Sequence, residues 1–394
     1  MSQKDVVIAS AARTPIGSFS GAFSSLSASD LGAVAVTEAV KRAGASPEDV
    51  DRVYMGNVLS GGMGQAPARQ AGIKAGLPVS AGAITLNKVC GSGLQAVMFA
   101  RREVLVDEAD VLVAGGMESM TNAPYLLPDA RGGYRMGNGS IIDSMIHDGL
   151  WDPYDDVHMG VCGDAVAEKY GFTREDQDAF AAESYRRALA AQKEGRFKEE
   201  IVPVSVPQRR GEPLLVDEDE EPGRGNVDKM PKLRPAFTKT GTVTAANASS
   251  INDGAAALVV CSAEAAKSRG FQVLARIVGD STAAVEPKWF TIAPVGALAK
   301  LYERTGTKPL DWDLYEINEA FSGVTMAAAK EHGIDLDRVN VNGGAASLGH
   351  PIGCSGARIL VTLLYALKDR GASRGIATLC IGGGEAVALG VELV

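Results

Sequence analysis

Apolar and polar positions follow a helical period and then a strand-like run at two widely separated places in the chain. From Leu31 the apolar residues recur at helical spacing, and a short apolar run from Val53 to Asn57 has the length of a buried strand. The same succession returns between Ile292 and Asn318, where Leu314 to Asn318 is the apolar run. Repeated helix and strand patterns predict an α/β fold with mainly parallel sheets covered by helices.

Three pairs of similar strings, found in the same order near the two ends of the chain, indicate an internal duplication. A strand-ending Asn, a Cys that opens an apolar helix and a Gly-Gly pair after an apolar run each occur twice. The paired positions are Asn57 and Asn318 at 318 − 57 = 261, Cys90 and Cys354 at 354 − 90 = 264, and Gly115 and Gly382 at 382 − 115 = 267. Slowly growing offsets favour two related α/β halves over coincidence.

The middle of the chain differs from both ends in amino-acid composition, and this difference predicts an inserted segment. Residues 121–140 are rich in Gly, Pro and Asn, and an Ala-rich helix is expected from Thr173 to Glu194, with Thr173 as its N-cap. Loops on a rigid scaffold commonly carry substrate contacts. We therefore predict a first half made of residues 1–120 with 251–272, an inserted loop domain at 121–250 and a second half at 273–394.

Composition and charge restrict the classes of protein that the chain can belong to. With 394 residues, 46% of them hydrophobic and 22% charged, it has the composition of a globular protein, and it contains no apolar run of membrane-spanning length. A net charge of −9 disfavours a nucleic-acid binder. An anionic ligand would need a local basic patch, and the lysines and arginines between Arg209 and Lys239 provide one candidate.

The five cysteines are scattered and show no CxxC spacing, so neither a disulfide framework nor a zinc site is expected. The N-terminus lacks the long apolar segment of a signal peptide. These features predict a soluble cytoplasmic protein with free thiols and no membrane partner.

Cys90 is the first candidate for chemistry. It lies in the segment from Leu86 to Val97, where a predicted strand runs into an apolar helix that follows Gly91-Ser92-Gly93. A helix N-terminus carries partial positive charge, which favours a thiolate. The residue is therefore a candidate nucleophile, with a buried structural thiol as the alternative.

Three further residues stand at predicted strand or loop ends. His350, one of four histidines, lies in the small-residue segment from Val341 to Ala357 and is a candidate base or hydrogen-bond donor. Cys380 precedes a glycine turn, and Asn318 ends an apolar run, whereas Cys354 is expected to be structural. The glycine turn could alternatively cradle phosphate, but neither a P-loop nor a full GxGxxG pattern is present.

With these residues in these positions, the chain resembles the thiolase family. The resemblance spans nearly the whole chain and is strongest to the acetyl-CoA acetyltransferase branch, which works on short acyl chains. It implies the thiolase-like duplicated fold, a layered α/β/α/β/α core with an inserted loop domain. Four ordered blocks carry it: Asn87-Lys-Val-Cys-Gly-Ser-Gly-Leu94, Asn318-Glu-Ala-Phe321, Gly343-Gly-Ala with Leu348-Gly-His-Pro-Ile-Gly353, and Cys380-Ile-Gly-Gly-Gly384.

The resemblance implies a reversible condensation of two acetyl-CoA molecules by a ping-pong mechanism. Cys90 would carry the acyl group as a thioester, His350 would accept its proton, and Cys380 would act as base on the second substrate. One oxyanion hole would use His350 with a water held by Asn318, and the other the backbone N–H groups of Cys90 and Gly382. It also implies no cofactor, no metal, and a homotetramer, a dimer of dimers, assembled through residues 121–140.

The resemblance further implies which residues bind coenzyme A and where the chain departs from the family. Met159, at the end of the acyl pocket, should limit the acyl tail to about two to four carbons. Cys162 stands in an unusual Val-Cys-Gly-Asp segment, and Phe290-Thr291 replaces the Phe-Pro of potassium-activated members, so potassium dependence is not expected. The positions matched to coenzyme A are Ser249 and His158 near the pantetheine, with Leu150, Met159, Phe237, Ala320 and Phe321 as apolar walls.

Two other functions share the expected fold. A decarboxylating ketosynthase would also use a nucleophilic Cys but lacks a second catalytic Cys, so Cys380 argues against it. A non-catalytic carrier of lipids or acyl-CoA would be expected to lack the histidine or the second cysteine, whereas both are present here.

Overall fold

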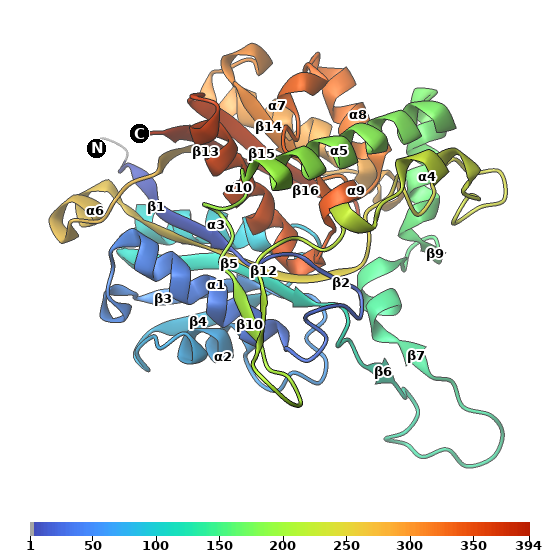
Figure 1. Cartoon of the computed structure of the whole chain (residues 1–394), viewed down its shortest axis with the longest axis horizontal. Coiled ribbons are helices and arrows are strands. Elements are labelled where there is room, and N and C mark those ends of the chain that lie inside the picture. The colour runs from blue at the N-terminus through green and yellow to red at the C-terminus, as the bar shows by residue number, and fades with distance from the viewer. Residues whose placement is uncertain (1–3) are drawn as a thin grey trace.

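The computed structural model describes residues 4–394 and contains two similar α/β halves (Figure 1). Strands of the first half are β1 (Val6–Arg13), β2 (Gly17–Ser18), β3 (Arg52–Gly56), β4 (Gly82–Leu86), β5 (Val111–Ser119) and β12 (Asn252–Ser262). Strands of the second half are β13 (Ala275–Ala284), β14 (Leu314–Ile317), β15 (Arg374–Ile381) and β16 (Glu385–Leu393). The insertion contributes short strands only, β6 (Tyr125–Leu126), β7 (Ile142–Asp143), β8 (Trp151–Asp152), β9 (Val157–His158), β10 (Val204–Val206) and β11 (Leu214–Val216).

Each half forms its own run of strands, and the two runs meet at β1 and β13. The order is β4-β3-β5-β12-β1 followed by β13-β16-β15-β14, with β2 paired to β12. Only the pairs β3–β4, β3–β5 and β14–β15 are parallel. The expectation of mainly parallel sheets is therefore wrong. Strand β16 must run antiparallel because only a tight glycine turn joins it to β15, and β12 returns antiparallel to β5 after the long insertion.

The helices form three layers around the two runs of strands. Helices α1 (Ala28–Ala43) and α2 (Pro67–Lys74) pack on the outer face of the first half. Helices α7 (Ala293–Thr305) and α8 (Ser322–His332) contribute to the buried cluster on the outer face of the second half. Between the halves lie α3 (Ser92–Leu105) and α10 (Ile352–Asp369). This arrangement confirms the layered α/β/α/β/α fold.

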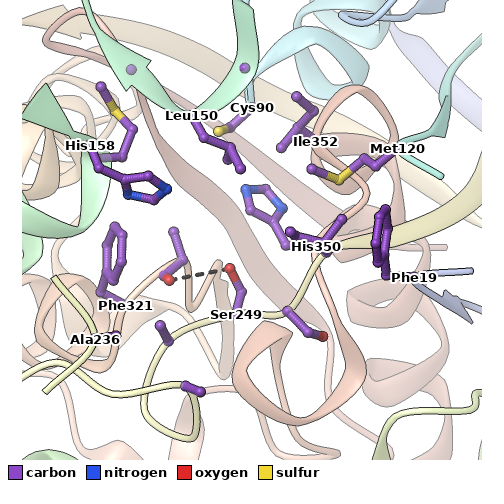
Figure 2. Close-up of a pocket in the computed structure, with 18 of the residues that line it drawn as sticks. Phe19, Cys90, Met120, Leu150, His158, Ala236, Ser249, Phe321, His350 and Ile352 are labelled. Carbon is purple, nitrogen blue, oxygen red and sulfur yellow. Dashed lines mark hydrogen bonds between the residues drawn. The ribbon is translucent and has the colours of Figure 1, made fainter. Parts of the chain in front are cut away.

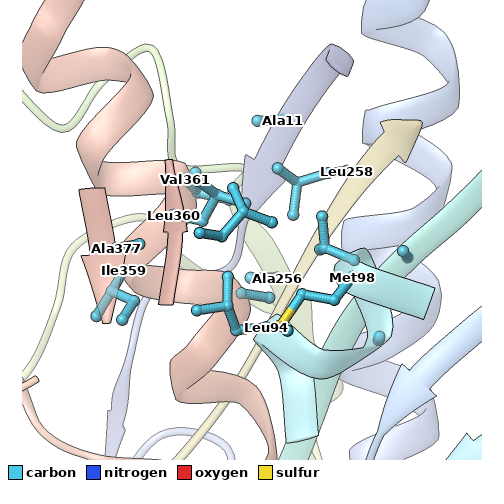
Figure 3. Close-up of a cluster of buried hydrophobic side chains, with 14 of the residues drawn as sticks. Ala11, Leu94, Met98, Ala256, Leu258, Ile359, Leu360, Val361 and Ala377 are labelled. Carbon is cyan, nitrogen blue, oxygen red and sulfur yellow. The ribbon is translucent and has the colours of Figure 1, made fainter. Parts of the chain in front are cut away.

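The core between the halves is built mainly from α3 and α10. In Figure 3, Leu94 and Met98 of α3 face Leu360 and Val361 of α10, with Leu258 of β12 beside them. The two helices approach closely because both carry small residues at their contact. A Cβ atom at Gly356 would lie 2.4 Å from the backbone N of Leu94, so only glycine allows this approach.

Strand register identifies which residues of the two halves are equivalent. Val7 pairs with Arg276 and Ile8 with Ala275, a pattern that maps onto itself when Val7 is matched to Ala275. Carried along the ladders, this match places Val53 on Leu314, at 314 − 53 = 261, which agrees with the offset between Asn57 and Asn318. The internal duplication is thus visible in the hydrogen-bonding pattern itself.

One of the three string matches is wrong. The same register places Gly115 on Ala377, at 377 − 115 = 262, and not on Gly382. Gly115 lies inside β5, where a Cβ atom would come within 2.0 Å of the backbone oxygen of Ala256. Gly382 instead follows the end of β15. The first Gly-Gly pair allows close contact between strands, whereas the second lies in a turn. The two pairs therefore do not occupy equivalent positions in the two halves.

The insertion contains two long helices and an extended excursion. Figure 1 shows the segment between β6 and β7 reaching away from the body of the molecule. Helix α5 begins after Thr173, whose side chain accepts a hydrogen bond from the backbone N–H of Asp176, so the predicted N-cap is confirmed. Within residues 4–394, no helix has both the length and the apolar character needed to span a bilayer. The remaining helices are α4 (Met159–Tyr170), α5 (Arg174–Glu194), α6 (Ala263–Arg269) and α9 (Ala345–Leu348).

Candidate active site

A cavity of about 590 Å³ lies where the insertion meets the two halves. Cys90, His350 and Gly382 line it, together with every residue that the sequence predicted to contact coenzyme A. Figure 2 shows Cys90 and His350 near its centre, with His158 and Phe321 on one side and Met120 and Phe19 on the other. Those predicted contacts are Leu150, His158, Met159, Phe237, Ser249, Ala320 and Phe321.

Cys90 occupies a tight turn between β4 and α3. Val89 before it has a positive φ of 45°, an unfavourable conformation for a β-branched residue that points to a local constraint. The hydroxyl of Ser92 holds the turn closed, since it accepts a hydrogen bond from the N–H of Lys88 at 2.8 Å and donates one to the carbonyl of Val89 at 2.7 Å. The turn presents the Cys90 side chain to the cavity.

The Cys90 thiol is protonated in the free protein at neutral pH. Burial raises the pKa of Cys90 to about 11, although hydrogen bonds from the backbone N–H groups of Gly382 and of Cys90 itself act in the opposite direction. Burial outweighs these hydrogen bonds, so the position near a helix N-terminus does not by itself make Cys90 a thiolate in this state. An attack by this sulfur needs a partner that accepts its proton.

His350 has the geometry of such a proton acceptor. Its Nδ1 lies in hydrogen-bond contact with the Ser355 hydroxyl, which donates to the carbonyl of Pro351 at 2.9 Å. Because that hydroxyl proton is already used, Nδ1 must carry a proton, which leaves Nε2 as the acceptor. Nε2 is buried and has no hydrogen-bond partner among residues 4–394. Burial also lowers the pKa of His350 to about 3, so the ring is neutral.

Cys380 and Asn318 lie just behind the cavity wall. Cys380, near the end of β15, is fully buried in one cluster with Met159 and Phe321. Burial raises the pKa of Cys380 well above that of an ordinary thiol, and the nearby Cys90 adds to the rise. Asn318 directly follows β14, and its Nδ2 has no partner among the described residues. Its Oδ1 faces Arg358 at 3.5 Å, the upper limit for a hydrogen bond.

Aromatic rings form one wall of the cavity. His158 stacks on Phe237 with ring centroids 4.6 Å apart, and Phe321 meets Phe237 edge-on at 6.3 Å. Nδ1 of His158 accepts a hydrogen bond from the N–H of Gly160 at 3.1 Å, and burial lowers the pKa of this ring. The Ser249 hydroxyl adds a polar group to the cavity lining, and it donates a hydrogen bond to the carbonyl of Ala320 at 3.2 Å.

The cavity also contains residues that the sequence did not single out. Phe19 and Met120 line its far side and carried no recognisable signal, because each is an ordinary apolar residue in its own segment. Ile352 also lines the cavity and belongs to the motif from Leu348 to Gly353. Arg224, which belongs to the candidate basic patch between Arg209 and Lys239, also lines the cavity. Glu221 lies beside it on the cavity wall.

Of the residues noted for unusual sequence context, two lie close to the cavity. Cys162 is buried in the same cluster as Met159 and Cys380, and Phe290 lines the cavity. Cys354 instead lies in the core between the halves. All five cysteines are free, and no group of three or more potential ligands suited to a metal ion occurs in residues 4–394.

Two models of one protein family match nearly the whole chain. The model of the thiolase N-terminal domain matches residues 6–264, and that of the thiolase C-terminal domain matches residues 271–393. The chain belongs to the thiolase family.

Among named relatives, the acetyl-CoA acetyltransferase of Cupriavidus necator is 54% identical over 98% of this chain and 99% of its own length. The acetyl-CoA acetyltransferase 1 of Arabidopsis thaliana is 50% identical over 99% of this chain and 95% of its own. The crystal structure of the Bacillus anthracis acetyl-CoA acetyltransferase superposes with a TM-score of 0.97 at 43% identity, covering 100% of this chain and 99% of the other. Acat5 thiolase from Ascaris suum, in complex with coenzyme A, gives a TM-score of 0.95 at 45% identity, covering 99% and 100%.

Proposed function

We propose that the protein is an acetyl-CoA C-acetyltransferase, which condenses two acetyl-CoA molecules reversibly to acetoacetyl-CoA and coenzyme A. The observation that carries this proposal is one cavity that contains a thiol, Cys90, and a neutral histidine, His350, whose Nε2 has no partner among residues 4–394. The names of the relatives supply the acetyl specificity.

In the first half-reaction the Cys90 sulfur attacks the carbonyl carbon of acetyl-CoA while its proton passes to Nε2 of His350. A new carbon–sulfur bond to Cys90 forms, and the bond between the acetyl carbon and the coenzyme A sulfur breaks. The backbone N–H groups of Cys90 and Gly382 supply one set of donors for the developing oxyanion. Such donors typically contribute a few kcal/mol each to transition-state stabilisation.

In the second half-reaction Cys380 removes a proton from the α-carbon of a second acetyl-CoA. Because burial keeps Cys380 protonated, the thiol must first lose its proton, and the departing coenzyme A thiolate is the acceptor available at that step. The resulting carbanion attacks the acetyl carbonyl, a carbon–carbon bond forms, and the bond to Cys90 breaks. Protonated His350, with a water held by Asn318, stabilises the oxyanion of the second substrate and then returns its proton to Cys90.

Coenzyme A occupies the arm of the cavity walled by aromatic rings. Ser249 and His158 contact the pantetheine, and Leu150, Met159, Phe237, Ala320 and Phe321 exclude water from it. The support is that all seven residues line a single cavity together with Cys90. No cofactor or metal takes part in the proposed steps, since thiol and imidazole groups carry every proton.

The direct test is conversion of acetoacetyl-CoA and coenzyme A to acetyl-CoA, quantified by chromatography, with Cys90→Ala as the control. Turnover that disappears in the variant is expected. Binding of acetyl-CoA without turnover would indicate a carrier and contradict the proposal. Preferential decarboxylation of malonyl-CoA would indicate a ketosynthase and would contradict it as well.

We extend the proposal to the organisation and assembly of the chain. The domain limits are 1–120 with 251–272, 121–250, and 273–394, and the enzyme works in the cytoplasm as a homotetramer, a dimer of dimers. Support for the assembly comes from apolar side chains left exposed on the excursion between β6 and β7, among them Tyr125, Met136 and Ile141. Sedimentation that gives a monomer at micromolar concentration would contradict it.

A further inference from the structure

The internal duplication gives the active site a counterpart in the first half. At the offset of 261, Asn318 at the end of β14 corresponds to Asn57 at the end of β3. At the offset of 262, Cys380 of β15 corresponds to Glu118 of β5, since 380 − 118 = 262. In the sequence match at the offset of 264, Cys90, two residues before α3, is paired with Cys354, the third residue of α10. We call Asn57, Glu118 and Cys354 the twin site.

Within the twin site, Glu118 is fully buried and saturated with hydrogen-bond donors. Its Oε1 accepts from Nδ2 of Asn57 at 2.8 Å and from the N–H of Leu59 at 3.1 Å. Its Oε2 accepts from the N–H of Val58 at 3.0 Å and from the N–H of Gly353 at 2.8 Å. Burial raises the pKa of Glu118 to about 7, whereas the backbone N–H groups of Val58, Leu59 and Gly353 act in the opposite direction. Because four donors fill both oxygens, the hydrogen-bond pattern favours the carboxylate over the protonated form.

These four hydrogen bonds join the two halves of the protein near the start of α10. Val58 and Leu59 belong to the loop after β3, whereas Gly353 is the second residue of α10. The contact is close, because a Cβ atom at Gly353 would lie 2.6 Å from Oε2 of Glu118 and 2.9 Å from the Cα atom of Asn57. His350 lies only three residues before Gly353, and Ile352 between them lines the cavity.

The twin site also lies within electrostatic reach of the catalytic thiol. The negative charge of Glu118 raises the pKa of Cys90 and of Cys354 alike, although burial is the larger cause in both. Glu118 is thus close to the turn that presents Cys90 and bonded to the segment that presents His350. No other carboxylate in residues 4–394 accepts a hydrogen bond from the first turn of α10.

We propose that Glu118 is a positioning residue of the reaction, and that the twin site has become a clamp that sets His350 at a fixed place relative to Cys90. Glu118 touches neither substrate nor the reacting atoms and acts through Gly353 and the loop after β3. The inference rests on the proposed function, because the reaction supplies the need for a fixed distance between thiol and imidazole. A displacement of about 1 Å in a catalytic group, even when it is caused by a change far from the chemistry, can cost about 100-fold in rate.

A variant of Glu118 could also lose activity because the whole protein becomes less stable. Asp280 provides the matched control for this alternative. Asp280 is also a buried carboxylate that joins the halves, since it accepts hydrogen bonds from Arg101 at 2.8 Å and Arg102 at 2.9 Å, both on α3. Its partners lie at the far end of α3 from Cys90. Asp280→Asn should therefore lower stability without disturbing the distance between Cys90 and His350.

The experiment compares wild type, Glu118→Gln, Glu118→Asp and Asp280→Asn in the thiolysis of acetoacetyl-CoA, at a temperature where thermal unfolding shows each to be folded. Glu118→Gln should lower kcat about 10- to 100-fold while KM changes by less than about threefold. Glu118→Asp, which keeps the charge, should recover part of the loss, and Asp280→Asn should keep the wild-type kcat.

Three results would overturn the inference. These are a wild-type kcat in folded Glu118→Gln, an equal loss of kcat in Asp280→Asn at a matched Tm, and a loss that appears only as a raised KM. The wild-type reaction separates the two proposals, since an inactive wild type overturns the proposed function itself. An active wild type with an unaffected Glu118→Gln overturns only the clamp.

Discussion

The active site and the twin site occupy equivalent places in the two halves, but they differ in which side-chain atoms are available to react. Cys380 is a buried thiol that can act as a base once it has lost its proton, whereas both oxygens of Glu118 already accept hydrogen bonds from four donors. Cys90 lines a cavity, whereas Cys354 is packed in the core. One scaffold thus carries chemistry in one copy and support in the other.

The largest expected difference lies between the two cysteines that open helices. Cys90→Ala removes the nucleophile and should lower kcat by roughly four to six powers of ten. Cys354→Ala removes one buried sulfur from the core, so it should lower the free energy of unfolding by about 1–3 kcal/mol and leave kcat within a few-fold of wild type. Steady-state thiolysis together with urea unfolding checks both. Loss of catalysis in folded Cys354→Ala would show that the twin site is not merely supportive.

The next difference concerns the residues at equivalent places in β5 and β15. Cys380→Ala removes the proposed base and should slow condensation by about two to four powers of ten. Acetyl transfer to Cys90 should be spared more than condensation, because only the second step needs a proton removed from carbon. Rapid-quench measurement of both half-reactions gives the ratio. Equal loss in both would assign Cys380 a different role.

The active site, unlike the twin site, borders a cavity, and Met159 is a buried residue that lines this cavity. Met159→Ala should raise the rate with 3-ketohexanoyl-CoA relative to acetoacetyl-CoA about tenfold or more, because one methylene in an apolar pocket is worth about 1–3 kcal/mol. The measurement is kcat/KM for both substrates. Leu150→Ala, on the proposed pantetheine wall, is the control and should affect both substrates alike. Rapid turnover of long-chain substrates by wild type would contradict the role of Met159.

The smallest effect concerns the neutral state of His350. An unfolded histidine takes up a proton near pH 6.5, whereas burial lowers the pKa of His350 to about 3, so between these values only the unfolded chain is protonated. This residue therefore reduces stability as the pH falls, by up to about 1.4 kcal/mol per pH unit. Between pH 7 and pH 5 the Tm of wild type should fall relative to that of His350→Gln. A difference in Tm that does not change with pH would contradict the assignment.

Periodicity and short ordered motifs predicted the α/β class, the duplication and the candidate residues Cys90, His350, Cys380 and Asn318. The order of the layers and the residues that line the coenzyme A cavity were implied by the resemblance to thiolases. The match of Asn57 with Asn318 agrees with the strand register, since both end equivalent strands. The match of Gly115 with Gly382 fails because glycine occurs both where strands crowd together and where the chain turns.

Other features depend on connections and burial that local patterns do not record. Strand direction is set by how the chain returns, so the antiparallel placement of β12 could not be derived from its own residues. Burial of Cys90 outweighs its helix position, and only the packed structure shows that burial. Phe19 reaches the cavity because Glu220 of the insertion accepts a hydrogen bond from the neighbouring Ser18 N–H at 2.8 Å, a contact between distant segments.

The division of labour between Cys90 and Cys380 is tested most directly by mass-spectrometric mapping of the acetyl adduct, alongside deuterium exchange at the α-carbon in heavy water. After incubation with acetyl-CoA, wild type and Cys380→Ala should both carry the acetyl group on Cys90. Only wild type should exchange the α-protons of the second substrate at an appreciable rate. An adduct on Cys380, or exchange at the wild-type rate in Cys380→Ala, would contradict the account.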